Sequence, residues 1–199
     1  YEWARTHMDI LDNTLNRLKK SKPLKGVTVA FCLHITKETS VLVMGAKELG
    51  ANVAVCGGNP LTTQDHIAAF LATQGIHIYA WTGQTNKEYD WCIEQVLSHK
   101  PSLICDDGAD MNVKVHFDKK FKSLKVLGST EETTAGVTRV RAMEKQGKLK
   151  YPVIIVNDTD TKHMFDNRYG TGQSTIDGYL RRSEEHTSEL QSLVNLVCR

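Results

Sequence analysis

The sequence predicts an α/β fold, a doubly wound and mostly parallel sheet with helices on both faces. Short apolar runs of about five residues alternate with helical patterns of about ten residues, which is typical of strands joined by crossover helices. The chain has 199 residues, which is enough for one domain of this kind with little left for a second. Hydrophobic residues make up 40% and charged residues 24%, a composition typical of globular and not of disordered proteins.

The expected elements follow one another without a clear linker before residue 180. Apolar residues at helical spacing predict an amphipathic helix in the first part of the chain, ended by Pro23 and Gly26: Ile10, Leu11, Leu15 and Leu18. Apolar runs predict strands over residues 27–32, 52–56, 76–81, 102–105, 124–127 and 153–156. Helical patterns between them predict helices over residues 39–49, 64–73, 86–98 and 135–146.

The charge pattern argues against a nucleic-acid partner. Formal net charge is +2, from 25 basic and 23 acidic residues, and the basic residues form no stripe. No apolar run approaches the roughly 20 residues of a membrane span, and the first residues lack the layout of a secretory signal. The five cysteines form no CxxC pair, and we expect Cys32, Cys56 and Cys105 to be packing residues in a reducing compartment. These patterns predict a cytoplasmic protein with a small-molecule partner, no nucleic acid and no membrane.

Polar side chains follow five of the expected strands, at the point where each strand ends. In an open parallel sheet, ligands bind beyond the carboxyl ends of the strands, so these groups should share one edge. The segments concerned are residues 34–38, 57–65, 106–110, 129–134 and 157–167. Their carboxylates, lysine, histidine and hydroxyls suit a polyhydroxylated small molecule and proton transfer at carbon or oxygen. The sequence has no nucleophile elbow, phosphate loop or metal-ligand pattern, so no metal is expected.

Each of these groups also has a plain structural explanation. Residues that stand where helices begin are, taken singly, expected to be N-caps: Thr39, Thr63 and Asp110. Asp106 and Asp107 cannot both cap one helix, so a ligand role stays open for them. A lone histidine such as His34 is more often a core residue, and Lys162 with Asp166 has the spacing of an ordinary helical ion pair. If burial lowers the lysine pKa, the same pair could instead act as a base.

Together these segments resemble the substrate-binding domain of the S-adenosylhomocysteine hydrolase (adenosylhomocysteinase) family. The matching segments are residues 23–26, 32–39, 63–66, 79–81, 88–95, 106–110, 131–136, 156–158, 162–170 and 174–178. So many motifs in one order make the resemblance highly specific over about residues 20 to 181. The resemblance implies a Rossmann-like, nucleoside-binding substrate domain over residues 1–181, and an NAD-binding domain that this chain lacks.

The resemblance implies NAD-dependent hydrolysis of S-adenosyl-L-homocysteine to adenosine and L-homocysteine, a step of the methyl cycle. In this family the ribose 3′-hydroxyl is oxidised transiently by NAD, homocysteine is eliminated, water adds, and the 3′ carbon is reduced again. Such a reaction needs a placed base at a carbon acid and a path for a proton to the leaving thiolate. The family also implies a homo-oligomer, a tetramer, for the full-length protein.

The family's motifs carry over to this chain residue by residue. Lys162 and Asp166 resemble the pair that handles the 3′-hydroxyl proton, and Asp107 resembles the carboxylate near the 4′ carbon. His34 resembles a proton donor and water-handling group near the 5′ side. Residues that match substrate-binding positions are Thr36, Glu38 and Glu132. Residues that match positions contacting NAD are Thr133, Thr134, Ala135 and Asn167.

The chain departs from the family pattern at several points. Thr171 stands where many members carry cysteine, which we interpret as a subgroup mark, and Ala135 replaces a frequent threonine. Residues 182–199 resemble the translation of a short-read sequencing adapter, so we expect a non-native tail there. Because the NAD domain is expected to be absent, we predict that the chain is inactive alone. Two other functions stay open: a catalytically silent, regulatory binding module of this family, and hydrolysis of S-inosyl-L-homocysteine.

Overall fold

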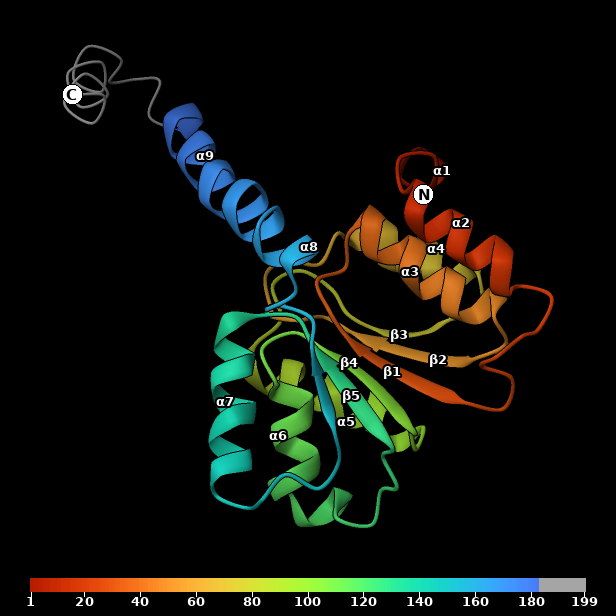
Figure 1. The fold of residues 1–199 in the computed structure, drawn as a ribbon, viewed down its shortest axis with the longest axis vertical. Helices are drawn as coiled ribbons and strands as arrows, with labels where there is room; N and C mark the ends of the chain where they lie inside the picture. Colours follow the sequence, from red (N-terminus) through yellow and green to blue (C-terminus); the bar gives the residue numbers. More distant parts are fainter. Residues whose placement is uncertain (183–199) are drawn as a thin grey trace. The chain divides into compact units, whose positions relative to one another are not determined.

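The computed structural model describes residues 1–182, which belong to two compact units (Figure 1). The first unit is Tyr1–Ile155 and the second begins at Val156. The adapter-like tail and Cys198 lie outside the described residues, apart from Arg182 at the end of the last helix. Among the helices of residues 1–182, none has the length and apolar character needed to cross a membrane.

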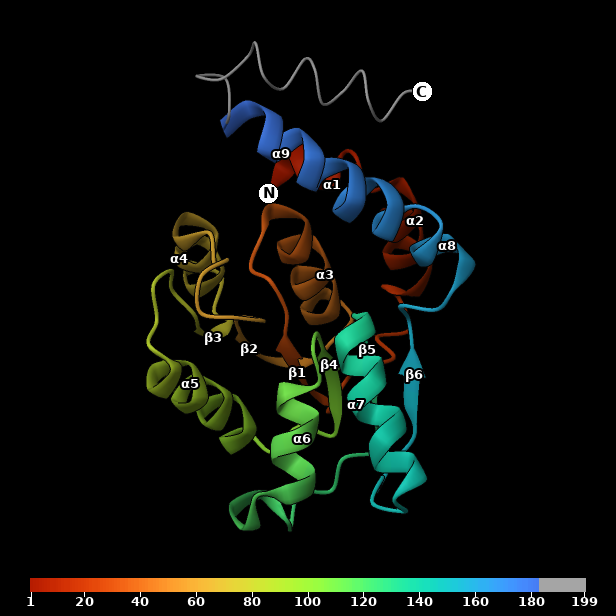
Figure 2. The same cartoon turned by 90° about the vertical axis from the view of Figure 1, so that its left-hand side faces the viewer.

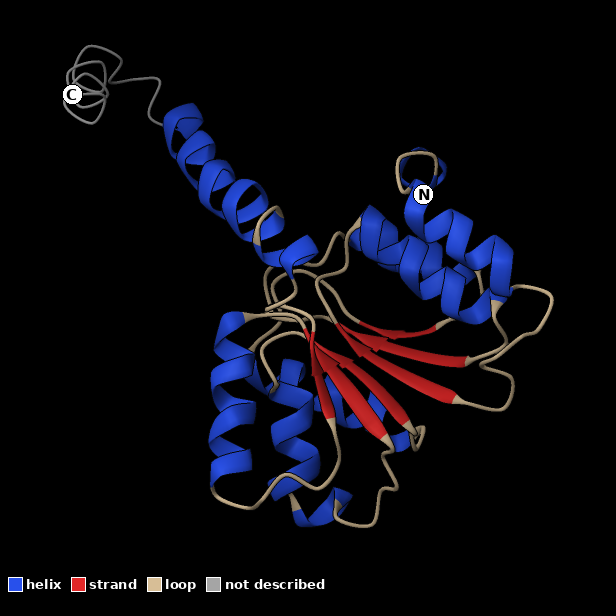
Figure 3. Ribbon diagram, viewed as in Figure 1, coloured by secondary structure: helices blue, strands red, loops and turns tan. Residues whose placement is uncertain are grey.

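The first unit is built on a six-stranded, entirely parallel sheet, which confirms the predicted fold class (Figure 3). The strands are β1 (Thr28–Cys32), β2 (Asn52–Cys56), β3 (His77–Tyr79), β4 (Leu103–Asp106), β5 (Gly128–Glu131) and β6 (Val153–Ile155). Their order in the sheet is β3-β2-β1-β4-β5-β6, so the winding direction reverses between β1 and β4. A crevice at such a reversal is where ligands of open parallel sheets bind.

Helices cover the sheet from both sides (Figure 2). Helices α3 and α4 lie on one face, and α5, α6 and α7 lie on the other. The helices of the first unit are α1 (Glu2–Arg5), α2 (Asp9–Leu18), α3 (Lys37–Glu48), α4 (Asp65–Thr73), α5 (Asn86–Ser98), α6 (Asp110–Phe117) and α7 (Thr134–Lys145), with a 3₁₀ turn at Lys119–Phe121. The second unit contains α8 (Asp160–His163), a π-helical stretch (Asp166–Gln173) and α9 (Ser174–Arg182). Thr171 lies in the π-helical stretch.

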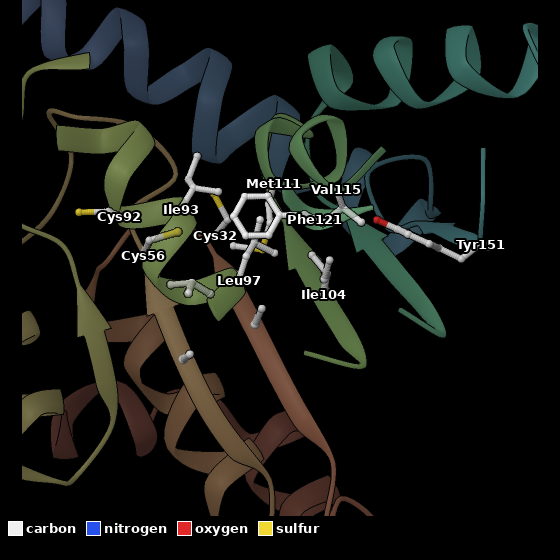
Figure 4. Packing of buried hydrophobic residues seen from close by; sticks show 13 residues of the cluster. Cys32, Cys56, Cys92, Ile93, Leu97, Ile104, Met111, Val115, Phe121 and Tyr151 are labelled. Carbon is white, nitrogen blue, oxygen red and sulfur yellow. The ribbon is translucent and has the colours of Figure 1, made fainter. Parts of the chain in front are cut away.

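The core has two layers because successive side chains of a strand point to opposite faces. Val29 and Phe31 of β1 pack in the layer that also holds residues of α3 and α4. Ala30 and Cys32 of the same strand pack in the layer with α5 and α6, shown in Figure 4. The cysteines predicted to be packing residues are free thiols, and Cys32 and Cys56 are fully buried while Cys105 is half-buried. Contact with Cys56 and burial raise the pKa of Cys32 well above its ordinary value, so a thiolate nucleophile is disfavoured there.

The half of the sheet formed by β4 to β6 is open on the side of α3. An apolar cavity of about 470 Å³ lies there, between α2, α3 and the strands. Its lining contains Leu15, Phe31 and Ile104 but none of the residues expected to form a site. Ile154 of β6 is 66% exposed on this part of the sheet, which contrasts with the fully buried Val55 of β2.

One expected strand is wrong. Residues 124–127 do not form the fifth strand, because Leu127 is 70% exposed and the strand begins only at Gly128. The real strand, Gly-Ser-Thr-Glu, contains no apolar residue, yet Ser129 and Glu131 are buried within it. Burial of Glu131 in this polar strand is supported by hydrogen bonds to nearby backbone, which apolar patterning does not reveal.

The expected amphipathic helix is confirmed as α2, which contains Ile10, Leu11, Leu15 and Leu18, and the short helix α1 precedes it after an interruption between Arg5 and Asp9. Arg5 stabilises the interruption by donating to Asp12 of α2 at 3.0 Å and to Glu48 of α3 at 2.8 Å. Helix α6 was not predicted because its buried face includes Asn112 and His116 as well as Met111 and Val115.

Candidate active site

His34, in the loop after β1, contacts residues from the loops after two other strands of the first unit. It lies just beyond β1, and its Nδ1 atom is 2.6 Å from Oγ1 of Thr62, in the loop after β2. Its Nε2 atom is 3.3 Å from Oδ2 of Asp107, in the loop after β4. The His34 side chain is 41% exposed while that of Asp107 is 8% exposed, so the pair opens to solvent on the imidazole side. The expected common edge is thus confirmed for these loops, and His34 is not a core histidine.

The loop after β2 is shaped to bring Thr62 to the imidazole. Asn59 Oδ1 accepts from the backbone N–H groups of Leu61 at 2.8 Å and of Thr62 at 3.1 Å, which turns the chain back. A side chain at Gly58 would place Cβ 3.2 Å from the His34 backbone nitrogen, so a glycine permits this close approach. The turn therefore positions a hydroxyl, an imidazole and a carboxylate in one row.

This row can move a proton between its members. A carboxylate only accepts hydrogen bonds, so with Asp107 ionised the Nε2–H of His34 donates to it. Nδ1 then accepts from the hydroxyl of Thr62, and the exposed imidazole can exchange its proton with a bound molecule. Such an arrangement suits general acid–base chemistry on an alcohol, a thiol or a carbon acid.

Asp106 has a different environment from its neighbour Asp107. Its Oδ2 accepts from the backbone N–H of Asn112 at 2.7 Å and from the Asn112 amide at 3.0 Å, and its Oδ1 accepts from the backbone N–H of Asp107. Complete burial raises the pKa of Asp106 to about 7. Tyr151 donates to Asn112 at 2.9 Å, which extends the buried network. The two acids therefore differ in position: Asp106 accepts hydrogen bonds from Asn112 in α6, and Asp107 lies beside His34. A ligand role for them stays a prediction.

The expected acid after β5, Glu132, is half-buried next to this network. Its backbone N–H donates to the carbonyl oxygen of Asp106 at 3.1 Å, continuing the ladder beyond the paired strands. The segments after β4 and β5 therefore run side by side, with Asp107 and Glu132 at corresponding places in them. This is the placement that the alternation of strands and helices predicted for the sheet edge.

Thr36 and Glu38 lie at the start of α3. The Thr36 hydroxyl accepts from the backbone N–H of Thr39 at 3.3 Å, so Thr36 is the N-cap of this helix. Glu38 is exposed, 3.9 Å from Nζ of Lys37. Their proposed contacts with a nucleoside stay a prediction.

The three expected N-caps are wrong. The caps of α3, α4 and α6 are instead Thr36, Gln64 and Ala109. Ala109 adopts a left-handed conformation with φ of 63°, which leaves the α6 start without a side-chain cap. Thr63 is buried with its hydroxyl unpartnered among the described residues, and its carbonyl accepts from Thr82. Local cap preferences thus misplaced each helix start by one to three residues.

The residues expected to contact NAD after β5 lie at the start of α7. Thr133 is the N-cap, and its hydroxyl accepts from the backbone N–H of Gly136 at 3.3 Å. Thr134 and Ala135 are exposed in the first turn. The first backbone N–H groups of a helix point outward and favour an anionic group, so this turn offers a place for one.

In the second unit Lys162 is the centre of a polar cluster. Its Nζ donates to Oδ1 of Asn157 at 2.9 Å and of Asn167 at 2.6 Å, and lies 3.3 Å from Oδ2 of Asp166. Asn167 also donates to Asn157 at 3.2 Å and lies 3.1 Å from Nδ1 of His163. The predicted ion pair at i,i+4 spacing is confirmed, and the lysine side chain is only 13% exposed.

Some residues of these clusters were not singled out from the sequence. Thr62 and Asn157 carry contacts to His34 and Lys162, and both follow strands, which was the available signal. Gly170 leaves room for the Asp166 carboxylate, because a Cβ there would lie 2.4 Å from Oδ1. Its place in the Asp166-to-Gly170 motif was visible, but the reason for a glycine was not.

Comparison with known proteins gives consistent matches. The sequence matches the family described as S-adenosyl-L-homocysteine hydrolase over residues 1–127 and 112–195. It is 53% identical to the adenosylhomocysteinase of Aeropyrum pernix over 180 residues, and 52% identical to that of Sulfurisphaera tokodaii. It is 50% identical to the S-inosyl-L-homocysteine hydrolase of Methanopyrus kandleri. Each match covers 90% of this chain and 42–43% of the relative, so the chain spans about two fifths of the relatives' length.

Proposed function

The chain belongs to the S-adenosyl-L-homocysteine hydrolase family, and from this premise we propose that it forms the nucleoside-binding part of such an enzyme. The proposed reaction is hydrolysis of S-adenosyl-L-homocysteine to adenosine and L-homocysteine, by transient 3′-oxidation, elimination and addition of water. The observation that carries the proposal is His34 held between Thr62 and Asp107 at the reversal point of the sheet. Homo-oligomer formation and a cytoplasmic location stay predictions.

His34 and Asp107 would act at the 4′ and 5′ positions of the substrate. Asp107, oriented by its contact with His34, would accept the proton of the 4′ C–H. His34 would pass the proton that Asp107 accepts on to the leaving thiolate, for which one ring nitrogen would exchange its contact with Thr62 or Asp107 for the substrate, and it would then hold the entering water. Glu132, on the neighbouring segment, would bind ribose hydroxyls, and Thr36 with Glu38 would hold the base.

Lys162 and Asp166 would handle the proton of the 3′-hydroxyl. The ammonium has acceptors in Asn157, Asn167 and Asp166, so its orientation is fixed before a substrate binds. Because Asp166 is the more exposed partner, at 56% against 13%, it is the group that would pass the proton to solvent.

Four residues would hold NAD: Thr133, Thr134, Ala135 and Asn167. The residues fit such a group in one respect, because the exposed first turn of α7 offers backbone N–H groups to an anionic moiety. NAD, when bound, supplies the oxidation and the later reduction of the ribose 3′ carbon. Because the hydroxyl and the backbone N–H of Thr133 are occupied by internal hydrogen bonds, we expect this residue to contact the cofactor through its methyl group.

Hydrolysis of S-inosyl-L-homocysteine is the second candidate. It is favoured by the 50% and 48% identity to hydrolases of that name from Methanopyrus kandleri and Methanocaldococcus jannaschii. Glu38 is compatible with adenine, because a carboxylate accepts from its exocyclic amino group, but it does not settle the base. A silent regulatory module is less well supported, because the expected site residues are all retained: His34, Asp107, Glu132, Lys162 and Asp166.

The test uses this chain completed to the relatives' length with the remaining part of the Aeropyrum pernix protein, referred to as the completed enzyme. We expect it to cleave S-adenosyl-L-homocysteine and to prefer it over the inosyl compound when the two compete. The unmodified Aeropyrum pernix protein is the control, and the 199-residue chain alone should show no turnover. A completed enzyme that retains NAD but cleaves neither thioether would overturn the proposal.

A further inference from the structure

A buried carboxyl group connects the two segments that carry Asp107 and Glu132. Glu131, the last residue of β5, is fully buried. Its Oε1 accepts from the backbone N–H of Gly108 at 2.8 Å, in the loop after β4. The same oxygen accepts from the backbone N–H and the hydroxyl of Thr133, both at 3.1 Å, at the start of α7. One oxygen atom thus gathers three donors from two segments.

A glycine makes room for this carboxyl group. A Cβ on Gly136, in the first turn of α7, would lie 2.0 Å from Oε1 and 2.2 Å from Cδ of Glu131. Real Cβ atoms do not approach other atoms so closely, so any side chain there displaces the carboxyl group or the helix. The absence of a side chain at Gly136 therefore allows α7 to pack directly against the Glu131 carboxyl group.

The connection is reinforced from the other side of the loop after β4. Arg139 of α7 donates to the carbonyl oxygen of Gly108 at 2.9 Å, so the backbone N–H and the backbone carbonyl of Gly108 both have partners. Asp106 and Glu131 are register partners in the sheet, and Asp107 and Glu132 directly follow them. A displacement of Glu131 would therefore shift the spacing of the two residues expected to contact substrate.

The two oxygens of Glu131 differ. Oε2 is buried and has no hydrogen-bond partner among the described residues, while Oε1 has three. Burial raises the pKa of Glu131, which weakens the case for a charge as its useful property. An amide side chain presents one acceptor oxygen with the same geometry, so glutamine can reproduce the contacts of Oε1.

We propose that Glu131 is a positioning residue, whose Oε1 sets the spacing of Asp107 and Glu132 by accepting hydrogen bonds from Gly108 and Thr133. The role depends on the acceptor oxygen and not on a negative charge. It deepens the proposed function and rests on it for its consequence in catalysis, but the connection itself can be measured without any substrate.

The first experiment measures backbone amide exchange in the 199-residue chain by NMR. In Glu131→Ala we expect the Gly108 and Thr133 amides to exchange at least about tenfold faster, because each buried N–H loses its acceptor. Glu131→Gln should keep both amides protected within about threefold of wild type. The control is Ser129→Ala, on the same face of β5, whose hydroxyl has no partner among the described residues.

A second variant guards against a Glu131→Ala protein that does not fold. Gly136→Ala leaves the acid in place but pushes Cβ into its carboxyl group, and should expose the same two amides. Thr138→Ala, two residues further along α7 at an exposed position, is its control. Unchanged protection of Gly108 and Thr133 in folded Glu131→Ala or Gly136→Ala would overturn the proposal, whatever the chain's activity.

The second experiment measures kcat and KM of the completed enzyme. A shift of reacting groups by about 1 Å costs on the order of 100-fold in rate, so Glu131→Ala should lose about that in kcat at temperatures well below unfolding. Glu131→Gln should stay within about tenfold of wild type, with the same pH profile. Equal losses in both variants would show a need for charge and overturn the proposal. A wild-type enzyme without turnover, but with the amide pattern intact, would contradict only the proposed function.

Discussion

Two regions of the candidate site are built in opposite ways. At the ends of β1 and β2 the polar residues stand alone: His34 is 41% exposed, and it is held by a hydroxyl in a turn. At the ends of β4 and β5 each outward acid follows an inward one, so that Asp107 is preceded by Asp106 and Glu132 by Glu131. The inward acids are fully buried and bind backbone N–H groups. The first region therefore depends on single side chains, and the second depends on buried support.

The largest effect should come from the outward acid of the β4 region. Asp107→Asn in the completed enzyme should lower kcat by about 1,000-fold, because general base catalysis contributes roughly 10²–10⁴. Asparagine keeps the size of the side chain, so nucleoside binding, measured by calorimetry, should change far less than kcat. Retention of the wild-type rate would show that Asp107 takes no part in the reaction. The two regions would then not differ in their contribution to catalysis.

The inward acid of the same region, Asp106, should affect how the free energy of unfolding depends on pH. The pKa of folded Asp106, about 7, lies above its ordinary value of 3.8. Unfolded molecules therefore lose this proton near pH 4 and folded ones only near pH 7, so rising pH favours unfolding in that range. The contribution of Asp106 to stability should fall between about pH 4 and pH 7, by up to a few kcal/mol, and level off above.

The measurement is chemical unfolding of the 199-residue chain at a series of pH values. In Asp106→Asn the fall should be smaller by this contribution, while the buried Glu131, whose pKa is also raised by burial, keeps its own, on top of a constant loss from the hydrogen bonds to Asn112. Asp9→Asn, at the exposed start of α2, should leave the pH dependence unchanged. A wild-type slope in Asp106→Asn would show that its proton behaves as in the unfolded chain.

This contrast also explains which parts were predictable. The order of strands and helices was readable because Val29, Phe31 and their equivalents lie in continuous apolar runs. The polar edge could be predicted because the carboxyl ends of parallel strands lie at the same edge of the sheet. The fifth strand was not, since Glu131 is buried by hydrogen bonds that its sequence neighbours do not indicate. For the same reason the sequence could not predict that Asp106 points to Asn112 and Asp107 to His34.

The first region should give a smaller effect when its support is removed. Thr62→Val keeps the shape of the side chain but loses the hydroxyl that contacts Nδ1 of His34 at 2.6 Å. A hydrogen bond of this kind contributes about 1 kcal/mol, so kcat/KM of the completed enzyme should fall by about tenfold or less. The matched control is Thr73→Val, because Thr73 is exposed at the end of α4. Thr82→Val is unsuitable, because the Thr82 hydroxyl donates to the loop backbone at Thr63.

A loss as large as that expected for Asp107→Asn would contradict the contrast, because Thr62 would then be as necessary as the acid. The pH profile of kcat/KM distinguishes the two explanations. If Thr62 only orients His34, the profile keeps its shape and the rate falls at every pH. If the hydroxyl itself carries a proton in the reaction, the loss is severe and the serine variant Thr62→Ser restores the rate.

The smallest effect should come from Glu38, which is exposed and makes only a 3.9 Å ion pair with Lys37. Exposed pairs contribute little, so Glu38→Gln should change the stability of the chain by less than about 0.5 kcal/mol. Its effect should appear in selectivity instead, because a carboxylate accepts from the adenine amino group while an amide can also donate to the hypoxanthine carbonyl. Competition kinetics of the completed enzyme should therefore move toward the inosyl substrate by a few-fold. An unchanged preference would mean that the base is read elsewhere, and that the β1 region contributes His34 alone to recognition.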